Sequence, residues 1–568
     1  LRRMCMDSVV DERTLWEIYL TAFEMAVTEG KAKTIMSSYN MINGTYANEN
    51  THLLTEILRG EWGFDGFVVT DWGGDNDHPE GVKAGSNLVM PAPGPDCADG
   101  LVKAVKEGRV SEADLDKRLK ELLGVVFSTS EAVSKAPKTF DKDAHHAIAR
   151  RCAEGSIVLL DNDGILPLKK ETKTVIIGDF AGKPRYQGAG SSQVNPTRLD
   201  NLKDALASGG LNVTAYAKGF SRVDPKPQQA LIDEAVAAAK GADVVLLCVG
   251  LDEILESEGM DRQHMELSKG QQALIDGVCA VNGNVVLVLS GGAPFVMPER
   301  SKYRAAIHGY LGGQAGAGAM ANALLGKINP SGKLNESWPE KLSDNPSYPY
   351  FPSPERTAEY REGLYIGYRY YDTAGVPVRY PFGYGLSYTG FAYSNLSASR
   401  EAVTFTVTNT GAMDGAEVAQ VYVSCKDGKV FRPNKELKGF AKVFLKAGES
   451  KTVTVALDDK AFRYFNVQTN RWEIEGGEYR LEVGASSADI RLVASVEVEG
   501  TGAPIPYDRE KLSCYYSAQV QAVPDDQFAT LLGRPIPQDK WDRSQTLGYN
   551  DSLSQMIYAK GFVARFAA

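Results

Sequence analysis

The chain has 568 residues, too many for a single hydrophobic core, and roughly 150 residues per domain predicts three or four domains. Its hydrophobic (43%) and charged (24%) fractions are typical of globular proteins, and its net charge of −10 argues against nucleic-acid binding, which needs a basic face. No apolar run approaches the ~18 residues of a membrane span, so we expect no membrane contact.

Cysteine and histidine usage predicts no metal site and no cofactor. The seven cysteines are scattered without a C-x-x-C pair, and the six histidines show no H-E-x-x-H or similar spacing. Such cysteine usage is typical of a reducing compartment, so a cytoplasmic location is expected. The chain does not begin with Met, and we therefore expect the natural N-terminus to lie upstream.

Helices and short strands alternate over residues 1–130. Such alternation implies parallel strands, in an open sheet or in a barrel. Ser111 is the expected N-cap of the last helix, with Asp114 at its third position. Apolar spacing predicts strands over 34–40, 67–70 and 86–91, and helices over 11–30, 48–62, 96–108 and 111–128.

A second α/β unit follows a Ser-, Ala-, Lys- and Pro-rich linker, expected over 129–141. A helix from Asp143 leads into GSIVLLDNDGILPL (155–168). The strands of this unit are strongly apolar, which indicates a sheet covered on both faces. We expect strands over 174–179, 212–219, 244–250 and 284–290, and helices over 199–208, 227–242 and 268–281.

The remaining chain changes character twice. Residues 341–395 are rich in Tyr and Pro without periodicity, and beyond them apolar and polar residues alternate, which predicts a β-sandwich. Residues 500–568 are polar and irregular, with one weak helix expected over 552–566. The predicted boundaries are 1–130, 131–154 (linker and helix), 155–340, 341–395 (connecting segment), 396–499 and 500–568.

The stretch FDGFVVTDWGG (64–74) ends a predicted parallel strand on Asp71 and Trp72. The carboxyl end of such a strand is where α/β folds place catalytic groups, although a helix cap explains Asp71 equally well. Trp72 favours a sugar site, because an indole ring stacks on the C–H face of a sugar and a carboxylate accepts hydrogen bonds from the sugar hydroxyl groups. The preceding strand brings Met36 and Tyr39 to the same edge.

Two loops carry further polar groups. LDEILESEGMDRQHMEL (251–267) holds five acidic residues before Arg262, and a solvated acidic loop is the commoner interpretation of such a cluster. YQGAGSSQVNP (186–196) does not match the G-x-G-x-x-G pattern, so no dinucleotide site is predicted.

Motifs along residues 5–497 resemble glycoside hydrolase family 3, the β-glucosidase type. The resemblance implies the C-terminal part of a (β/α)8-type barrel, an α/β sandwich domain and a fibronectin type III-like domain. It also implies a retaining β-glycosidase that releases glucose from the non-reducing end of short β-glucosides or aryl glucosides. The matching motifs include DSVVDERTLWEIYL (7–20), MSSYNMINGTYANENTHLLTEILRGEWGFDGFVVTDWGG (36–74), KAGSNLVMP (83–91), GSIVLLDNDGILPL (155–168), ESEGMDR (256–262), GGQAGAGAMANALLGKINPSGKLNESWP (312–339), YREGLYIGYRYYD (360–372) and YPFGYGLSYT (380–389).

The resemblance also assigns roles to residues. It implies that Asp71 is the catalytic nucleophile and Glu258 the acid/base, with Glu256 as the alternative. The residues implied to bind the sugar are Arg3, Met36, Tyr39, Trp72 and Ser191.

The exact function and the completeness of the barrel stay open. The alternative functions are a β-xylosidase of the same fold and a non-catalytic carbohydrate-binding or assembly protein. Only three barrel strands are predicted, and eight are needed, so we expect the missing half to come from the same polypeptide upstream. A homodimer is a further expectation.

Overall fold

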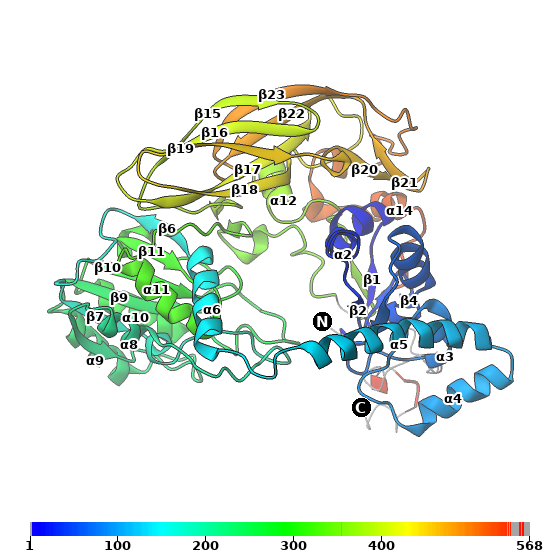
Figure 1. Ribbon diagram of the computed structural model, residues 1–568, viewed down its shortest axis with the longest axis horizontal. Coiled ribbons are helices and arrows are strands. Elements are labelled where there is room, and N and C mark those ends of the chain that lie inside the picture. The colour runs from blue at the N-terminus through cyan, green and yellow to red at the C-terminus, as the bar shows by residue number, and fades with distance from the viewer. Residues whose placement is uncertain are drawn as a thin grey trace.

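A computed structural model describes residues 3–353, 355–541, 544, 546, 556–557 and 559–561. Figure 1 shows three parts: a blue N-terminal part, a cyan-to-green α/β part, and a yellow-to-orange all-β part above both. This is the fold class predicted from the sequence. The helix expected over 552–566 lies largely outside the described residues.

The N-terminal part contains the three predicted strands. β2 (Thr34–Met36) and β5 (Phe67–Val69) pair in parallel, with Met36 opposite Val69. Leu88, in the third predicted strand, forms a parallel bridge with Val69. Because the three segments run in the same direction, their carboxyl ends meet at one edge.

Helices flank these strands, and the first is not continuous. The helix expected over 11–30 consists of α1 (Glu12–Thr14), the π-helical η1 (Leu15–Tyr19) and α2 (Thr21–Thr28). Trp16, in η1, stacks on Phe465 of the all-β part at 4.7 Å between ring centroids, which fixes the two parts against each other. The other elements here are β1 (Asp7–Val9), β3 (Met41–Ile42), β4 (Thr45–Tyr46), η2 (Ala47–Glu49), η3 (His52–Glu61), α3 (His78–Ala84) and α4 (Pro95–Lys106).

The long helix α5 (Glu112–Lys135) leads out of the N-terminal part toward the α/β part (Figure 1). Its N-cap is Ser111, whose side chain accepts the Asp114 N–H at 3.0 Å, as predicted. The expected linker start at 129 is wrong, since the helix continues to Lys135. Helix formers and a Glu131–Lys135 ion pair extend it, and Pro137 ends it.

The α/β part is built on a six-stranded sheet with the order β6-β11-β10-β9-β7-β8. All neighbours are parallel except β6 and β11. β9 is buried along its whole length, as its apolar run predicts. The strands are β6 (Val158–Asn162), β7 (Thr174–Ile177), β8 (Val213–Ala217), β9 (Val244–Gly250), β10 (Val285–Ser290) and β11 (Ala305–His308); the helices are α6 (Lys142–Ser156), α7 (Asp179–Gly182), α8 (Leu202–Ser208), α9 (Gln229–Ala239), α10 (Lys269–Cys279) and α11 (Gly316–Leu324), with short turns η4 (Arg300–Lys302) and η5 (Gly313–Ala315).

The all-β part is a sandwich of a three-stranded and a four-stranded sheet. Alternate residues of β16 (Ala402–Asn409), namely Val403, Phe405 and Val407, are fully buried between the sheets. The other strands are β15 (Phe391–Ala398), β19 (Ser450–Ala456), β17 (Gly415–Cys425), β18 (Glu436–Leu445), β22 (Gly477–Gly484) and β23 (Ile490–Val498), beside the hairpin β20 (Arg463–Asn466) and β21 (Arg471–Ile474) with η7 (Asp459–Ala461).

The connecting segment and the C-terminal region tie the parts together. β13 (Thr357–Glu359) pairs in parallel with β1, and Tyr515 is fully buried in an apolar cluster with Val9 and Phe431. Residues of the C-terminal region therefore pack on the N-terminal part. The remaining elements are β12 (Trp338–Pro339), η6 (Leu342–Asp344), α12 (Tyr368–Ala374), β14 (Val378–Tyr380), α13 (Ser513–Tyr516), η8 (Val520–Ala522) and α14 (Asp525–Leu532).

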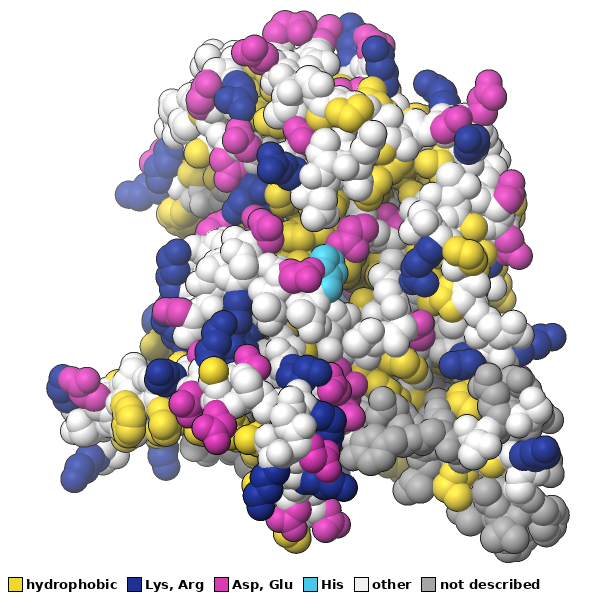
Figure 2. All heavy atoms as spheres, turned by 90° about the vertical axis from the view of Figure 1, so that its right-hand side faces the viewer, with side chains coloured by type: hydrophobic (Ala, Val, Ile, Leu, Met, Phe, Trp, Pro, Cys, Tyr) yellow, Lys and Arg dark blue, Asp and Glu magenta, His cyan; other side chains and the backbone are white. Residues whose placement is uncertain are grey.

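Charged side chains of both signs lie on the surface. Acidic and basic side chains are intermixed over the face shown in Figure 2. Among the described residues, no helix combines the length and apolar character required to cross a membrane.

Candidate active site

The segments that follow β2 and β5 leave the same edge of the sheet. The Ser37 N–H donates to the Val69 carbonyl at 2.8 Å, and the Thr70 N–H donates to the Leu88 carbonyl at 2.9 Å. Tyr39 and Asp71 follow within two residues of these contacts. They therefore lie where α/β barrels place catalytic groups.

Asp71 does not cap a helix. Its Oδ1 accepts the backbone N–H of the next residue, Trp72, at 2.7 Å. The next helix, α3, has Asp77 as its N-cap instead, six residues farther along. Burial, and then a hydrogen bond to the Asp71 carboxylate, raise the pKa of Tyr39. Asp71 thus faces the strand mouth with a tyrosine beside it.

Glu258 comes from the α/β part, on the acidic loop that follows β9. Its N–H donates to the Ala189 carbonyl at 3.0 Å, where the two loops form a parallel bridge. The carboxylate accepts the Ser191 N–H on Oε2 at 2.6 Å and Arg3 Nη1 on Oε1 at 2.9 Å. Hydrogen bonds from Ser191 and Arg3 lower the pKa of Glu258 to about 2, so this carboxyl group is ionised in the protein without substrate.

Glu256 is held in a different direction. Both of its oxygens lie 2.9 Å from the Gly292 N–H, and Oε2 lies 3.4 Å from Nη2 of Arg185. The Arg185 side chain is only 1% exposed. Glu256 therefore anchors the loop inside the α/β part, whereas Glu258 reaches the N-terminal part.

Arg3 links the two carboxylates. Its guanidinium carbon lies 5.3 Å from the centroid of the Tyr39 ring. The hydrogen bond to Glu258 raises the pKa of Arg3, and the charge of Asp71 acts in the same direction. Asp71, Tyr39, Arg3 and Glu258 thus form one cluster, built from residues of two parts of the fold.

The other residues singled out from the sequence lie around this cluster. Met36 ends β2 and Trp72 follows Asp71, and each is 52% exposed, which is high for large apolar side chains. Ser191 contacts Glu258 directly. The sugar-binding roles of these residues stay predictions.

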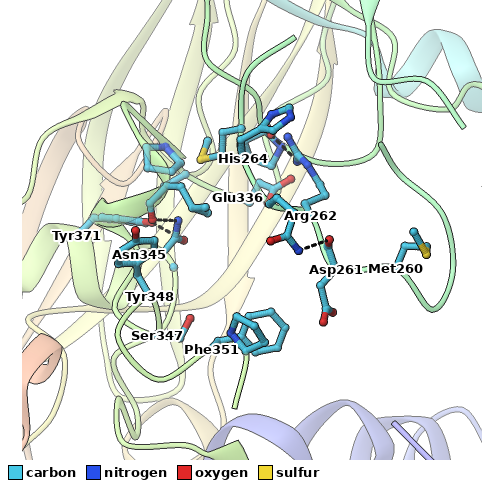
Figure 3. Close-up of a pocket in the computed structure, with 18 residues that line it drawn as sticks. Met260, Asp261, Arg262, His264, Glu336, Asn345, Ser347, Tyr348, Phe351 and Tyr371 are labelled. Atoms are coloured by element: carbon cyan, nitrogen blue, oxygen red, sulfur yellow. Dashed lines mark hydrogen bonds between the residues drawn. The ribbon is translucent and has the colours of Figure 1, made fainter. Parts of the chain in front are cut away.

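A cavity of about 880 Å³ opens two residues beyond Glu258, at Met260 (Figure 3). Arg262 lines one side, with Nη1 donating to the Pro294 carbonyl at 2.9 Å, while its buried Nε and Nη2 have no hydrogen-bond partner in the described structure. Desolvation, and then the charge of Glu256, raise the pKa of Glu336 in this cavity to about 7. Tyr348, Phe351 and Tyr371 add aromatic surface.

A smaller cavity lies between this one and the cluster's arginine. It has a volume of about 260 Å³, is lined by Arg3, and shares the lining residues Ser347 and Phe351 with the larger cavity. The two cavities are therefore neighbours, and the smaller one reaches the cluster at Arg3.

Sequence reasoning missed the residues that orient Glu258. Gly190 adopts a φ of +111°, and a Cβ there would lie 2.5 Å from the Cβ of Glu258, so only glycine fits. Arg185 and Gly292 fix Glu256 through contacts between distant loops. The only sequence signal was Gly190, the second glycine of GAGSS, and glycine is too common in loops to identify this contact.

Family models match all three parts of the chain. The Glycosyl hydrolase family 3 N terminal domain matches residues 6–125, and the Glycosyl hydrolase family 3 C-terminal domain matches residues 157–388. A Fibronectin type III-like domain matches residues 417–487. These matches confirm the predicted barrel portion, α/β sandwich and β-sandwich.

Individual proteins agree with the family models. The chain is 47% identical over 555 residues to Thermostable beta-glucosidase B of Acetivibrio thermocellus, covering 96% of this chain and 73% of that protein. It is 44% identical to an Exo-alpha-(1->6)-L-arabinopyranosidase of Bifidobacterium breve, over 89% of this chain and 68% of that protein.

The fold agrees equally well with a solved structure. The GH3 beta-glucosidase of Bifidobacterium adolescentis superposes with a TM-score of 0.85 at 42% identity, over 92% of this chain and 78% of that chain. The family models, the relatives and the solved structure all give the same result. The chain belongs to glycoside hydrolase family 3.

Proposed function

We propose that this chain is a retaining β-glucosidase that releases glucose from the non-reducing end of short or aryl β-glucosides. The observation that carries the proposal is the convergence of Asp71 and Glu258, from two parts of the fold, on Arg3 and Tyr39. Two carboxylates at one sugar site are what double displacement requires.

Each carboxylate has a separate task in this mechanism. The Asp71 carboxylate attacks the anomeric carbon while the bond to the leaving oxygen breaks, and Glu258 donates its proton to that oxygen. Glu258, now a carboxylate, takes a proton from water, and the water oxygen displaces Asp71 from the sugar. Trp72 and Met36 would contact the apolar faces of the glucose ring.

Glu258 must gain a proton before it can act as an acid. Its contacts with Ser191 and Arg3 keep it ionised in the absence of substrate. We infer that a sugar hydroxyl accepts the hydrogen bond of Arg3 in place of Glu258. The pKa of Glu258 then rises when substrate is bound. Arg3 then serves sugar binding and proton control together.

The leaving-group side of the substrate would occupy the cavity that begins at Met260. Tyr348 and Phe351 line this cavity and offer flat apolar faces to a second sugar or an aryl ring. The proposed cytoplasmic location and homodimer stay predictions.

Ser191→Ala tests the control of the Glu258 proton. Ser191→Ala removes the side-chain hydrogen bond from Ser191 to the ionised carboxylate and keeps the backbone one, so the pKa of Glu258 should rise by about one unit in the free enzyme. NMR titration of the isotope-labelled Glu258 carboxyl group measures this pKa. Ser192→Ala, at the exposed neighbouring position, should leave the pKa of Glu258 in place. A pKa of Glu258 that does not rise in Ser191→Ala would contradict this role.

A substrate panel tests the glycone. We expect the p-nitrophenyl β-D-glucoside to have a kcat/KM at least about tenfold above the β-D-xyloside and the α-L-arabinopyranoside, both of which lack the C6 hydroxymethyl group. The arabinopyranosidase relatives make the third substrate the main competitor. Preference for either pentoside would overturn the glucose assignment but not the mechanism. Hydrolysis of none would favour the carbohydrate-binding alternative.

A further inference from the structure

Three metal-ligating side chains meet where the loop that carries Asp71 approaches α3 and α4. They are Asp75, in that loop; His78, the first residue of α3; and Cys97, in the first turn of α4. One ligand atom from each lies within 4.8 Å of the other two. All three residues are partly buried, which distinguishes them from a solvated charge cluster.

The spacing suits a tetrahedral metal ion. The Cys97 Sγ lies 3.8 Å and the His78 Nδ1 lies 3.5 Å from the same oxygen, Oδ2 of Asp75. Bonds of about 2.0–2.3 Å at tetrahedral angles separate neighbouring ligand atoms by about 3.3–3.8 Å. Only small side-chain shifts would therefore bring all three atoms onto one ion.

The surroundings support a cation on two further grounds. The His78 Nδ1 is buried and makes no hydrogen bond in the described structure. The second carboxylate oxygen of Asp75, Oδ1, accepts a hydrogen bond from Asn48 Nδ2 at 3.0 Å. Ser37 in turn donates to Asn48 Oδ1 at 3.1 Å. Such an outer shell orients a ligating carboxylate.

We propose that Asp75, His78 and Cys97 form a binding site for a zinc-like divalent cation. The mixed thiolate, imidazole and carboxylate set suits Zn²⁺, with water in the fourth position. On binding, the Cys97 thiol gives up its proton to solvent and the thiolate sulfur bonds the metal, with no change in oxidation state.

The site would act on structure and not on the sugar directly. It joins the loop after Asp71 to the starts of α3 and α4, so bound metal would hold the nucleophile loop in place. A metal-free alternative is that Asp75 and His78 only form an ion pair, with Cys97 as an inert neighbour. The two alternatives differ in whether sulfur contacts an added metal.

Cobalt titration of the purified full chain decides between them. We expect one equivalent of Co²⁺ to bind with a thiolate-to-cobalt charge-transfer band, and Zn²⁺ to displace it and to raise Tm. Cys97→Ser should abolish the band, and Asn48→Ala should weaken binding by about 10–100-fold. The matched control is Cys152→Ser, at an exposed free cysteine on α6, which should keep the band.

Two results would overturn the site. One is the absence of stoichiometric Co²⁺ binding by the wild-type chain, and the other is a charge-transfer band that survives in Cys97→Ser. Circular dichroism of Cys97→Ser in the absence of metal separates lost binding from lost folding. If that variant does not fold, the titration of the wild-type chain still decides.

Discussion

Asp71→Asn should lower kcat for β-glucoside hydrolysis by about 10⁴-fold or more, because an amide cannot form the glycosyl ester through which the reaction proceeds. The change keeps size and shape, and the Trp72 N–H can still donate to the remaining oxygen. Tm should therefore change little, and the Kd for a competitive sugar ligand should be retained. Steady-state kinetics measures kcat, thermal unfolding measures Tm, and calorimetric titration measures Kd.

Asp65→Asn is the matched control for that variant. Asp65 lies before β5, and its side chain is 71% exposed and pairs with the surface residue Lys33. Its activity should stay within about twofold of the wild type, since such pairs contribute little to stability. Wild-type activity in Asp71→Asn would contradict the assignment of Asp71 as the nucleophile.

The second large effect should separate Glu258 from Glu256. Glu258→Gln should slow turnover of an alkyl β-glucoside by about 10²–10⁴-fold, because the alkoxide leaves only with a proton. A dinitrophenyl leaving group needs no proton, so the first step should stay fast. Stopped-flow measurements should then show a burst of dinitrophenol followed by slow turnover, because water activation also needs Glu258.

Glu256→Gln should behave differently. It leaves the buried Arg185 without its carboxylate, and the free energy of unfolding should fall by about 2 kcal/mol. Hydrolysis of alkyl and aryl glucosides should decline together, without a burst. If the burst followed Glu256→Gln instead, Glu256 would be the acid/base and the assignment to Glu258 would be wrong.

The clearest sequence patterns predicted the fold well. The run VVLLCVG became β9 with the predicted bounds, because a strand buried on both faces leaves an unbroken apolar run. Asp71 was found at the end of a strand for the same reason. The end of α5 was missed, since the Ser-, Ala-, Lys- and Pro-rich composition after residue 128 suggested a linker, whereas the helix continues to Lys135 with a Glu131–Lys135 ion pair in its last turns.

The site was predicted only in part. Glu256 and Glu258 lie two residues apart in an aperiodic loop, and their sequence gives no indication of which one points toward Arg3. That depends on Arg185, Gly190 and Gly292, which lie on other loops and meet this loop only in the folded chain. For the same reason, the spacing of Asp75, His78 and Cys97 matched no metal motif although their side chains converge.

The convergence of two parts of the fold has a mechanical consequence. Glu258 meets the residues of the N-terminal part only because the α/β part packs where it does, and its bond to Arg3 crosses between the two parts. The geometry of catalysis therefore depends on domain packing, which Trp16 and Phe465 help to fix from the other side.

Covalent trapping tests the central claim, that Asp71 is the nucleophile. A 2-deoxy-2-fluoro-β-D-glucosyl fluoride reacts through the same first step, and the fluorine slows release of the intermediate. Peptide mass spectrometry should locate one 2-fluoroglucosyl group on Asp71 in the wild-type chain, and none in Asp71→Asn. A label on any other carboxylate, or hydrolytic activity without any label, would contradict the account.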